Sequence, residues 1–393
     1  MKKEALLTVI IPVFNGEQFI RDTTGHILSS TYPELEVLLI DDGSTDDSGR
    51  ICRSLQEQDG RIKYIYTENG GIAAARNKGL EAASGQYVCF CDQDDETRPD
   101  MYEDILTAME KHSADIGMCS TGRDIDGKRN IFESLRDGCY EGEEIRSCLL
   151  YPLLFRGYNY DFAKSENYLY GSVWKCIFKR QLINDVGITF RSFVDYEDDW
   201  LFVTQALTEA KRAVTVSKVG YYWKVNRMSR SHTHRHILDM PERLQLLDAW
   251  EDEYLGRGKT SRTVLKEYQK VRLCEHYVSL MENGFPEGSH GFPLGSRVEK
   301  KAYYEKAKKY ILQSGYRKQL EAAGHLKKNA LKRRLVLGSL RYLGIRAAFC
   351  LTPAFDKLIQ GAENISWLVR WERKSKTGKR RRKDEADYSD SLL

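Results

Sequence analysis

A buried strand that ends in three carboxylates constrains this chain more than any other stretch of its sequence. Residues 86–95 read QYVCFCDQDD, an apolar run of β-forming residues followed by Asp92, Asp94 and Asp95. Such a run is typical of a strand that is buried on both faces of a parallel sheet. Open α/β sheets bind ligands outside the carboxyl ends of their strands, so a ligand is expected beside these acids.

The three carboxylates have two interpretations. Like charges packed this closely repel one another, so a positive group is expected among them. Oxygen ligands suit Mg²⁺ or Mn²⁺, which characteristically bridges one or two carboxylates to substrate phosphates. Aspartates are also frequent in solvated turns where strands end. The segment alone leaves a metal–diphosphate site and a solvated acidic turn equally open.

Strand-like and helix-like stretches alternate around this segment. Strands are predicted over residues 6–13, 36–40, 62–66 and 115–120, and helices over residues 17–30, 47–58, 72–83 and 99–111. Strands that alternate with helices of about a dozen residues indicate a right-handed, mostly parallel sheet. We therefore predict an α/β fold of the Rossmann-like kind, with helices on both faces and a nucleotide-sized crevice at the strand ends.

The pattern is looser after residue 120. The predicted elements there are a hairpin over residues 123–132 around Asp126 and Gly127, helices over residues 143–154 and from the acids at 195–199 to Ala210, and an edge strand over residues 214–223. Residues 172–182 are apolar, and Trp174 and Phe178 could line a pocket. From residue 240 the pattern is helical, with helices predicted over residues 241–255, 263–283 and 298–323 and a basic amphipathic tract after them.

Charge divides the chain unevenly. Residues 1–240 hold 29 Lys and Arg against 38 Asp and Glu, a balance of −9, whereas residues 241–393 hold 32 against 19, a balance of +13. The first part is therefore the expected catalytic region, and the second part is suited to an anionic partner. We predict a domain over residues 1–235, a helical region over 236–325, and a basic tail over 326–393 with a disordered end.

The sequence also bears on where in the cell the protein is expected. No signal-peptide pattern precedes the first strand, and no stretch approaches the ~20 apolar residues that span a bilayer. Nine cysteines fall into no zinc-binding spacing. We therefore expect a cytoplasmic, reduced protein, either free or peripheral at the inner face of the cell membrane.

Four segments, in this order and spacing, resemble the family 2 glycosyltransferases of the GT-A fold. They are Thr8-Val9-Ile10-Ile11-Pro12-Val13-Phe14-Asn15, Asp41-Asp42-Gly43-Ser44-Thr45-Asp46, Gly71-x4-Arg76-Asn77-x-Gly79 and Asp92-x-Asp94-Asp95-x3-Pro99. The resemblance covers roughly residues 6–230 and includes a later acidic helix start. It implies transfer of a sugar from a nucleotide donor, with inversion, usually with Mg²⁺ or Mn²⁺. UDP is the default donor nucleotide.

The resemblance also implies a donor site at the strand ends. Asp41 resembles the contact to base and ribose, Asp92 the first acid of the DxD motif, and Asp94 its metal ligand. Backbone groups beside Pro12 and Phe14 could read a nucleobase edge. Arg76 resembles a nucleotide-contacting arginine, although it could instead neutralise the acids. The predicted donor residues are Pro12, Val13, Phe14, Glu17, Asp41, Asn69, Arg76, Asp92 and Gln93, with Asp92 and Asp94 as metal ligands.

The catalytic base is expected in the acidic helix start, where two registers fit. Glu197-Asp198 preserves the Glu-Asp pair of the family and makes Asp198 the base. Asp198-Asp199 keeps the spacing to Phe202 and makes Asp199 the base, which is the register we favour. These acids could also simply complement the helix dipole. Trp174, Glu197 and Trp200 are the predicted acceptor-side residues.

Two C-terminal features remain open. His232, His234 and His236 could complete a metal shell or lie in an exposed basic loop. The tract over residues 326–383 interleaves cations with aromatic and aliphatic residues, which suits either an anionic membrane surface or a helical bundle that makes a homo-oligomer. No nucleic-acid-binding module is visible.

The predicted function is an inverting, metal-dependent transfer of a sugar to a hydroxyl of a glycan or lipid-linked acceptor in surface polysaccharide synthesis. A sugar nucleotidyltransferase would need a glycine-rich first loop with a basic residue, and residues 12–16 have neither. A scaffold without catalytic activity would need neither the acids Asp92 and Asp94 nor the acids at residues 197–199.

Overall fold

The computed structural model describes residues 5–155, 169–192, 198–225, 239–256, 260–283, 297–322, 331–346, 348 and 351–352. The chain divides into two compact units. The first contains residues 1–233 and 246–268, and the second contains residues 234–245 and 269–393. The domain boundaries expected at residues 235 and 325 stay predictions.

The first half of the sheet is parallel and is connected by helices. Its order is β3 (Ile62–Thr67), β2 (Leu35–Asp42), β1 (Leu7–Val13) and β4 (Tyr87–Phe90). The apolar runs of β1 and β2 are buried throughout their length, as expected for strands covered on both faces. The helices between these strands are α1 (Ile20–Leu28), α2 (Ser48–Gln58) and α3 (Ile72–Ala82).

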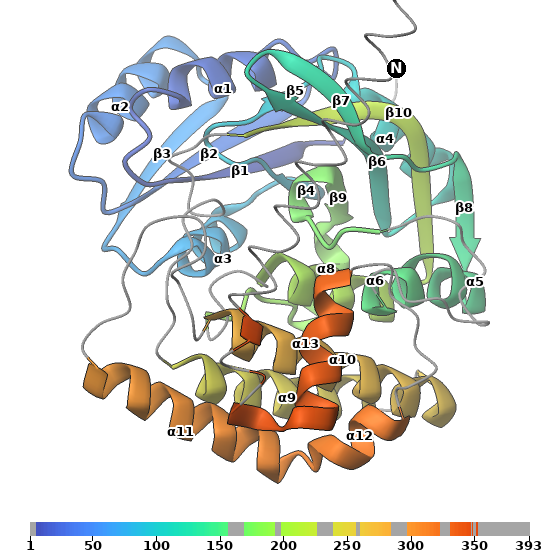
Figure 1. Ribbon diagram of the computed structural model, residues 1–393. Coiled ribbons are helices and arrows are strands. Elements are labelled where there is room, and N and C mark those ends of the chain that lie inside the picture. The colour runs from blue at the N-terminus through green and yellow to red at the C-terminus, as the bar shows by residue number, and fades with distance from the viewer. Residues whose placement is uncertain are drawn as a thin grey trace, which may run out of the picture. The chain divides into compact units, whose positions relative to one another are not determined.

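Helices cover both faces of this half (Figure 1). Helices α1 and α2 lie on one face, and α3 packs against β1 and β2 on the other. A Cβ atom on Gly79 of α3 would lie 2.3 Å from the Ile10 side chain, so glycine permits the close approach of this helix to β1. This packing sets the position of every other residue of α3, including Arg76.

The second half of the sheet is mixed. Beyond β4 the order is β9 (Cys176–Lys179), β6 (Ile116–Ile125), β10 (Arg212–Lys224) and β5 (Glu96–Thr97). Strand β9 runs antiparallel to both of its neighbours, so β6 is again parallel to β4. Strands β7 (Lys128–Glu133) and β8 (Gly138–Glu141) pair with β6 and β10. In the described part of the chain, one ten-stranded sheet therefore carries the fold.

Two predictions in this half are corrected. The strand expected at an edge over residues 214–223 lies inside the sheet, because β6 pairs along one side of it and β5 and β8 pair along the other. Phe178 belongs to β9 and is fully buried in the core, so it lines no pocket. The hairpin prediction is confirmed, since Ile125 pairs with Lys128 across a turn with φ of 51° at Asp126 and 79° at Gly127.

Helices complete the first unit. They are α4 (Met101–His112), α5 (Glu143–Ile145), a π-helical stretch (Arg146–Leu150), α6 (Tyr151–Phe155), a 3₁₀ turn (Val173–Lys175), α7 (Arg180–Val186) and α8 (Asp198–Glu209). Parts of α9 (Met240–Gly256) and α10 (Arg262–Asn283) also belong to it. Tyr254 of α9, for example, donates a hydrogen bond to Glu209 at the end of α8.

The second unit is helical in its described part. It contains the remainder of α9 and α10 with α11 (Arg297–Gln313), α12 (Tyr316–Ala322) and α13 (Leu331–Leu343). The single helix expected over residues 298–323 is broken, because Gly315 adopts a φ of +65° and ends α11. Tyr303 of α11 donates a hydrogen bond to the carbonyl of Leu280. Among the described residues, no helix is both long and apolar enough to traverse a bilayer.

Candidate active site

The acids that follow β4 lie at the carboxyl edge of the parallel strands and have different environments. Asp92 is half-buried. Asp95 is buried and accepts hydrogen bonds from the Tyr221 hydroxyl at 2.7 Å and the Lys224 amide at 2.8 Å. Burial raises the pKa of Asp95 well above its usual range, and the neighbouring carboxylates Asp92 and Asp94 raise it further. Asp95 thus holds the loop that follows β4 against β10, and Asp92 and Asp94 lie on the same loop.

Arg76 is the positive group that these acids require. It lies on α3 with only 2% of its side chain exposed, and its Nη2 atom is 2.9 Å from Asp92 Oδ1. Its Nη1 atom is 2.8 Å from Asp198 Oδ2 and also donates to Asp199 Oδ1. The guanidinium therefore joins the end of β4 to the start of α8. We call Arg76, Asp92, Asp198 and Asp199 the arginine cluster.

One cation among three carboxylates leaves the arginine cluster with excess negative charge. Burial raises the pKa of Asp199 to about 7, and repulsion from Asp198 and Asp92 adds to this effect, against the lowering by Arg76 and the Val173 amide. Burial also raises the pKa of Asp198, which Arg76 likewise opposes. A carboxylate whose pKa is raised in this way is suited to general-base chemistry near neutral pH.

The two candidate bases differ in their access to solvent. The Asp198 side chain is 6% exposed, whereas that of Asp199 is 23% exposed. Asp199 Oδ2 also accepts a hydrogen bond of 3.2 Å from the Val173 amide, which orients its carboxylate. An acceptor hydroxyl could thus reach Asp199 more readily than Asp198. The third acid of this group, Glu197, lies outside the described residues.

The residues that the sequence predicts to contact the base and ribose lie at the ends of β1 and β2. Val13 and Asp41 are opposite each other in the two strands, and the carboxylate of Asp41 is buried. Its oxygens accept hydrogen bonds from the Ser44 amide at 2.9 Å and the Tyr64 hydroxyl at 2.8 Å. Burial, helped by Asp41, raises the pKa of Tyr64 to about 12. Asp41 is thus held rigidly at the strand end.

The start of α3 is fastened to β2 by Asp42. Its two carboxylate oxygens accept hydrogen bonds from the amides of Gly70 at 2.8 Å and Gly71 at 2.9 Å. The side chain of Asn69 donates to the carbonyl of Asp42 at 2.9 Å. Asn69, a predicted donor residue, therefore helps to hold the loop through which α3 delivers Arg76. The sequence did not single out Asp42 for this structural role.

Gln93, the middle residue of the DxD motif, pairs with the backbone of Phe14. Its Oε1 atom accepts from the Phe14 amide at 2.9 Å, and its Nε2 atom donates to the Phe14 carbonyl at 3.0 Å. A Cβ atom on Gly16 would lie 2.2 Å from Gln93 Oε1, so a side chain at this position would displace the Gln93 amide from Phe14. Glu17 accepts a hydrogen bond from the Asp47 amide and so anchors the same loop to the start of α2. These contacts connect the predicted nucleobase loop with the predicted metal ligands.

The predicted acceptor-side tryptophans are largely buried. Trp174 stacks on Tyr221, with ring centres 4.3 Å apart, and Trp200 donates its indole N–H to the Leu153 carbonyl. A Cβ atom on Gly171 would lie 2.8 Å from the backbone of Trp200, so the segment before Val173 lies directly against α8. Sequence reasoning missed Tyr221 and Val173; the alternation of Tyr221 and Trp223 on one strand was the available signal for Tyr221.

The donor set fits a divalent cation that takes part of its coordination from a substrate. Among the described residues, no group of three or more His, Cys, Asp or Glu side chains is arranged to hold a metal ion by itself. Asp92 and Asp94 are half-buried carboxylates two positions apart, and such acids hold Mg²⁺ together with substrate phosphates. The histidines 232, 234 and 236 lie outside the described residues.

Comparison with known proteins identifies the domain that carries this site. Residues 8–187 match the sequence model of the family described as Glycosyl transferase family 2. Over these residues, somewhat less than half of the chain, the sequence is similar to glycosyltransferase family 2. The predicted resemblance is thereby confirmed.

Two relatives illustrate how much of the chain is shared. The glycosyltransferase GlyA of Streptococcus pneumoniae serotype 4 is 31% identical over 249 residues, which are 61% of this chain and 34% of GlyA. The uncharacterized glycosyltransferase EpsJ of Bacillus subtilis is 25% identical over 279 residues, which are 70% of this chain and 77% of EpsJ. The chain thus spans about a third of the length of GlyA.

A solved structure supports the fold. The crystal structure of S. aureus TarS residues 1–349 in complex with UDP-GlcNAc has a TM-score of 0.64, with 90% of this chain and 92% of that chain covered. The two sequences are 19% identical, so this likeness concerns the fold alone. The predicted α/β fold of the GT-A type, followed by a mainly helical C-terminal region, is confirmed.

Proposed function

We propose that this family 2 glycosyltransferase domain transfers a sugar, with inversion, from a nucleotide-diphosphate donor to an acceptor hydroxyl. The arginine cluster carries the proposal. It brings the acids at the end of β4, where the leaving diphosphate would lie, together with a carboxylate of pKa about 7 at the start of α8. A leaving-group site and a general base are the two parts that an in-line displacement needs.

The donor occupies the crevice at the carboxyl ends of β1, β2 and β4. A UDP-sugar is the proposed donor, because TarS has been crystallised with UDP and with UDP-GlcNAc. Asp41 and the loop at Phe14 bind the base and ribose, and Arg76 stabilises the charge that develops on the diphosphate. A bound Mn²⁺ or Mg²⁺ would be held by Asp92 and Asp94 and would neutralise part of that charge.

Asp199 accepts the proton in the transfer step. The acceptor oxygen attacks the anomeric carbon from the face opposite the diphosphate, while its hydroxyl proton passes to the carboxylate of Asp199. The bond between the anomeric carbon and the diphosphate oxygen breaks, and the nucleoside diphosphate leaves with the electron pair. One displacement inverts the anomeric configuration. Asp198, which is more deeply buried, holds Arg76 in place.

A surface polysaccharide is the proposed product. TuaG of Bacillus subtilis, a putative teichuronic acid biosynthesis glycosyltransferase, is 40% identical over 109 residues, which are 28% of this chain and 43% of TuaG. The acceptor is a glycan or a lipid-linked glycan at the inner face of the membrane, and residues 326–383 contact that surface.

Isothermal titration of nucleoside diphosphates tests the donor site. We expect UDP to bind the full-length protein with Mn²⁺, to bind at least tenfold more weakly with chelator, and to lose its metal dependence in Asp94→Ala. Asp100→Ala is the matched control, because Asp100 also follows β4 but pairs with Arg98 and Lys218. Failure of a folded protein to bind any nucleoside diphosphate would refute the transferase proposal and favour a scaffold.

A further inference from the structure

A second group of functional side chains lies at the carboxyl ends of β6 and β10. The guanidinium carbon of Arg123 lies 4.3 Å from the ring centre of Phe132 and 4.8 Å from that of Trp223. The two rings are 5.7 Å apart and inclined by 60°, and Tyr170 packs on Phe132 at 4.5 Å. We call Arg123, Phe132 and Trp223 the aromatic–arginine site.

Among the described residues of this region, Arg123 differs from Arg129 and Lys224 in having no acidic partner. Arg129 pairs with Glu96 and Asp124, and Lys224 pairs with Glu96. In the described ranges, Arg123 forms no ion pair, and its buried Nε atom has no hydrogen-bond partner. Stacking on aromatic rings engages the faces of a guanidinium and leaves its in-plane N–H groups able to bind an oxyanion.

Backbone contacts connect this site to the candidate active site. Arg123 and Trp223 are opposite each other in β6 and β10, and the next residue of β10, Lys224, donates its amide to Asp95. Strand β6 is two places from β4 in the sheet, or about 10 Å at the usual spacing between strands. The site therefore lies on the same edge as the DxD acids, within reach of a short oligosaccharide.

Contacts through Tyr170 connect the aromatic–arginine site to Asp199, the proposed base. Tyr170 packs on Phe132, and its amide donates to Glu133 at 3.0 Å. Three residues later, the Val173 amide donates to Asp199. An acceptor chain that presents its hydroxyl to Asp199 could thus extend past Tyr170 towards Arg123.

We propose that the aromatic–arginine site is an acceptor subsite for a glycan that carries an oxyanion, either a phosphate or a carboxylate. Arg123 binds the oxyanion through its in-plane N–H groups, because a guanidinium matches the geometry of both anions. Phe132 and Trp223 pack against the adjoining sugar or polyol. The identity of this ligand as the acceptor rests on the proposed transferase function.

The test is titration of small anionic probes into the full-length protein saturated with UDP and Mn²⁺, so that the donor site is filled. The probes are sn-glycerol 3-phosphate and methyl glucuronide, with glycerol and methyl glucoside as neutral counterparts, and tryptophan fluorescence and NMR line broadening are the readouts. We expect saturable binding of at least one anionic probe and at least tenfold weaker binding of its neutral counterpart. The stronger anionic probe distinguishes phosphate from carboxylate.

Two arginine variants decide whether Arg123 is responsible. Arg123→Gln should weaken anion binding about tenfold or more, since a hydrogen bond to a charged group contributes ~1.5–3 kcal/mol. Arg129→Gln should leave it unchanged, because Arg129 already pairs with Glu96 and Asp124. If Arg123→Gln does not fold, Arg123→Lys keeps the charge without the fork and should bind the anion more weakly than wild type.

Three results would overturn the subsite. They are equal anion binding by wild type and the folded Arg123 variants, an equal loss in Arg129→Gln, and no anion binding by a protein that binds UDP. If anion binding depends on Arg123 but no nucleotide binds, the oxyanion site stands and the transferase function fails. The two proposals can therefore fail separately.

Discussion

At the scale of single residues, a guanidinium shared by three carboxylates controls the chemistry of the site. Arg76 is almost fully buried and has ion pairs with Asp92, Asp198 and Asp199. Burial raises the pKa of Asp199 to about 7, and repulsion from Asp198 and Asp92 adds to this effect, because the single charge of Arg76 does not neutralise all three acids. The same raised pKa suits Asp199 to its proposed role as a base and makes its charged form costly for the fold.

The proton affinity of Asp199 predicts the pH dependence of transfer. Sugar transfer by the wild type should rise with pH and reach half of its maximum near pH 7, where Asp199 becomes the carboxylate. Asp199→Asn should lose about 10²–10⁴-fold in turnover, the usual contribution of a general base. Its residual activity should not rise with pH around pH 7. Initial rates between pH 5 and 9 measure both effects. If the rise in rate around pH 7 is retained in Asp199→Asn but absent from Asp198→Asn, then Asp198 is the base.

The raised pKa of Asp199 also predicts that Asp199→Asn has a higher thermal stability than wild type at high pH. The pKa of Asp199 is higher in the folded chain than its usual value of 3.8, so the folded state binds its proton more tightly than the unfolded state. Its stabilising contribution is present below pH 4 and is lost as pH rises to about 7. Asp199→Asn should therefore melt a few degrees above wild type at pH 8, where ~1 kcal/mol corresponds to ~2–4 °C, and the difference should shrink at pH 5. Thermal unfolding at pH 5 and pH 8 measures this difference. The same difference in melting temperature between Asp199→Asn and wild type at both pH values would contradict the prediction.

Sequence reasoning located both groups of acids but not the geometry that joins them. The runs at Asp92–Asp95 and Asp198–Asp199 are visible in the sequence because each ends a strand or begins a helix. Arg76 and Asp198 are 122 positions apart, and only the folded chain shows that one guanidinium serves both runs. The choice between Asp198 and Asp199 likewise depends on exposure, which the spacing of residues does not give.

At the scale of elements, an ion pair buried inside the first unit holds the 3₁₀ turn against β7. Lys175 Nζ lies 2.5 Å and 2.6 Å from the two carboxylate oxygens of Glu133, and both side chains are at most 1% exposed. Glu133 also binds the Tyr170 amide, so the pair fixes the segment that carries Val173 to Asp199. The effect of these contacts is to orient the proposed base.

A double-mutant cycle on this pair should separate its stability from its positioning role. Glu133→Gln and Lys175→Met should each lower the free energy of unfolding by about 3–5 kcal/mol, because each leaves a buried partner unpaired, and the double variant should lose less than the sum. Urea unfolding measures these changes. Glu141→Gln, which breaks the exposed pair with Arg212, should cost at most about 1 kcal/mol.

The activity of the double variant gives the second readout. If the pair positions the base, the pH midpoint of transfer should rise, because the Val173 amide that lowers the pKa of Asp199 would be less well held. An unchanged midpoint in a stable double variant would restrict the pair to a structural role.

The elements that sequence reasoning misjudged are those whose environment comes from distant parts of the chain. Strand β9 has four residues and lies between β4 and β6, which precede it by many positions. The pattern of β10 is that of a half-exposed strand because it alternates between buried and exposed stretches, although short strands pair along its outer side. The βα repeats before residue 113 were predictable because each is local and, apart from the edge strand β3, has a mostly buried strand.

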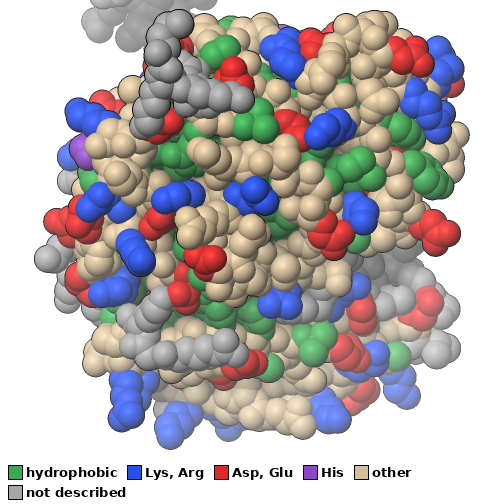
Figure 2. Space-filling model, turned by 180° about the vertical axis from the view of Figure 1, so that it is seen from behind, with side chains coloured by type: hydrophobic (Ala, Val, Ile, Leu, Met, Phe, Trp, Pro, Cys, Tyr) green, Lys and Arg blue, Asp and Glu red, His purple; other side chains and the backbone are tan. Residues whose placement is uncertain are grey.

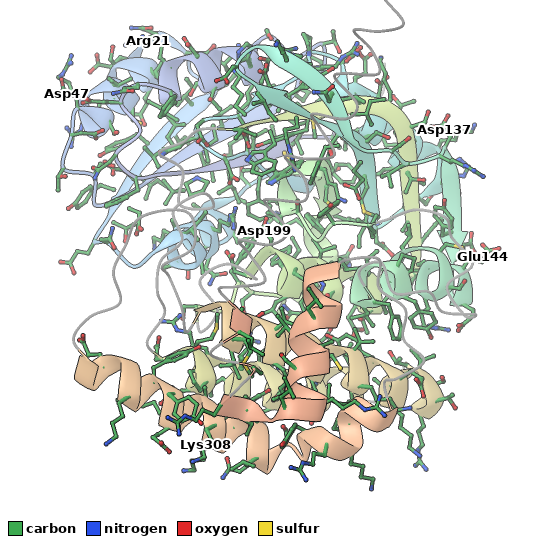
Figure 3. All side chains as sticks on the ribbon, viewed as in Figure 1. Arg21, Asp47, Asp137, Glu144, Asp199 and Lys308 are labelled. Carbon is green, nitrogen blue, oxygen red and sulfur yellow. The ribbon has the colours of Figure 1, made fainter. Side chains whose placement is uncertain are left out.

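At the scale of the whole molecule, the uneven charge of the chain is its clearest property. Basic and acidic side chains are interspersed on the face that Figure 2 shows, and the charge excess of residues 241–393 is known from the sequence. Figure 3 shows Lys308 on α11 of the second unit, whereas Asp199 belongs to the first. Residues 374–383 hold seven Lys and Arg in ten positions but lie outside the described residues.

This charge predicts a salt-sensitive association with anionic membranes. The full-length protein should sediment with phosphatidylcholine vesicles that contain phosphatidylglycerol, since each Lys or Arg near such a surface contributes about 1 kcal/mol. Binding should fall at high salt and with vesicles of phosphatidylcholine alone. Truncation after residue 373 should weaken it, whereas truncation after residue 383, which removes only the acidic end, should not. Equal binding by both truncated proteins would contradict a role for the basic run.

The arginine cluster also has a consequence for descent. Because Arg76 is buried among three carboxylates, replacing it alone leaves three like charges without their counterion, and replacing one acid alters the proton affinity of the others. The four positions are therefore coupled, although they are spread over 124 positions of the chain. A substitution at Arg76 should be tolerated better in a chain whose acids have also been replaced than in one that keeps all three.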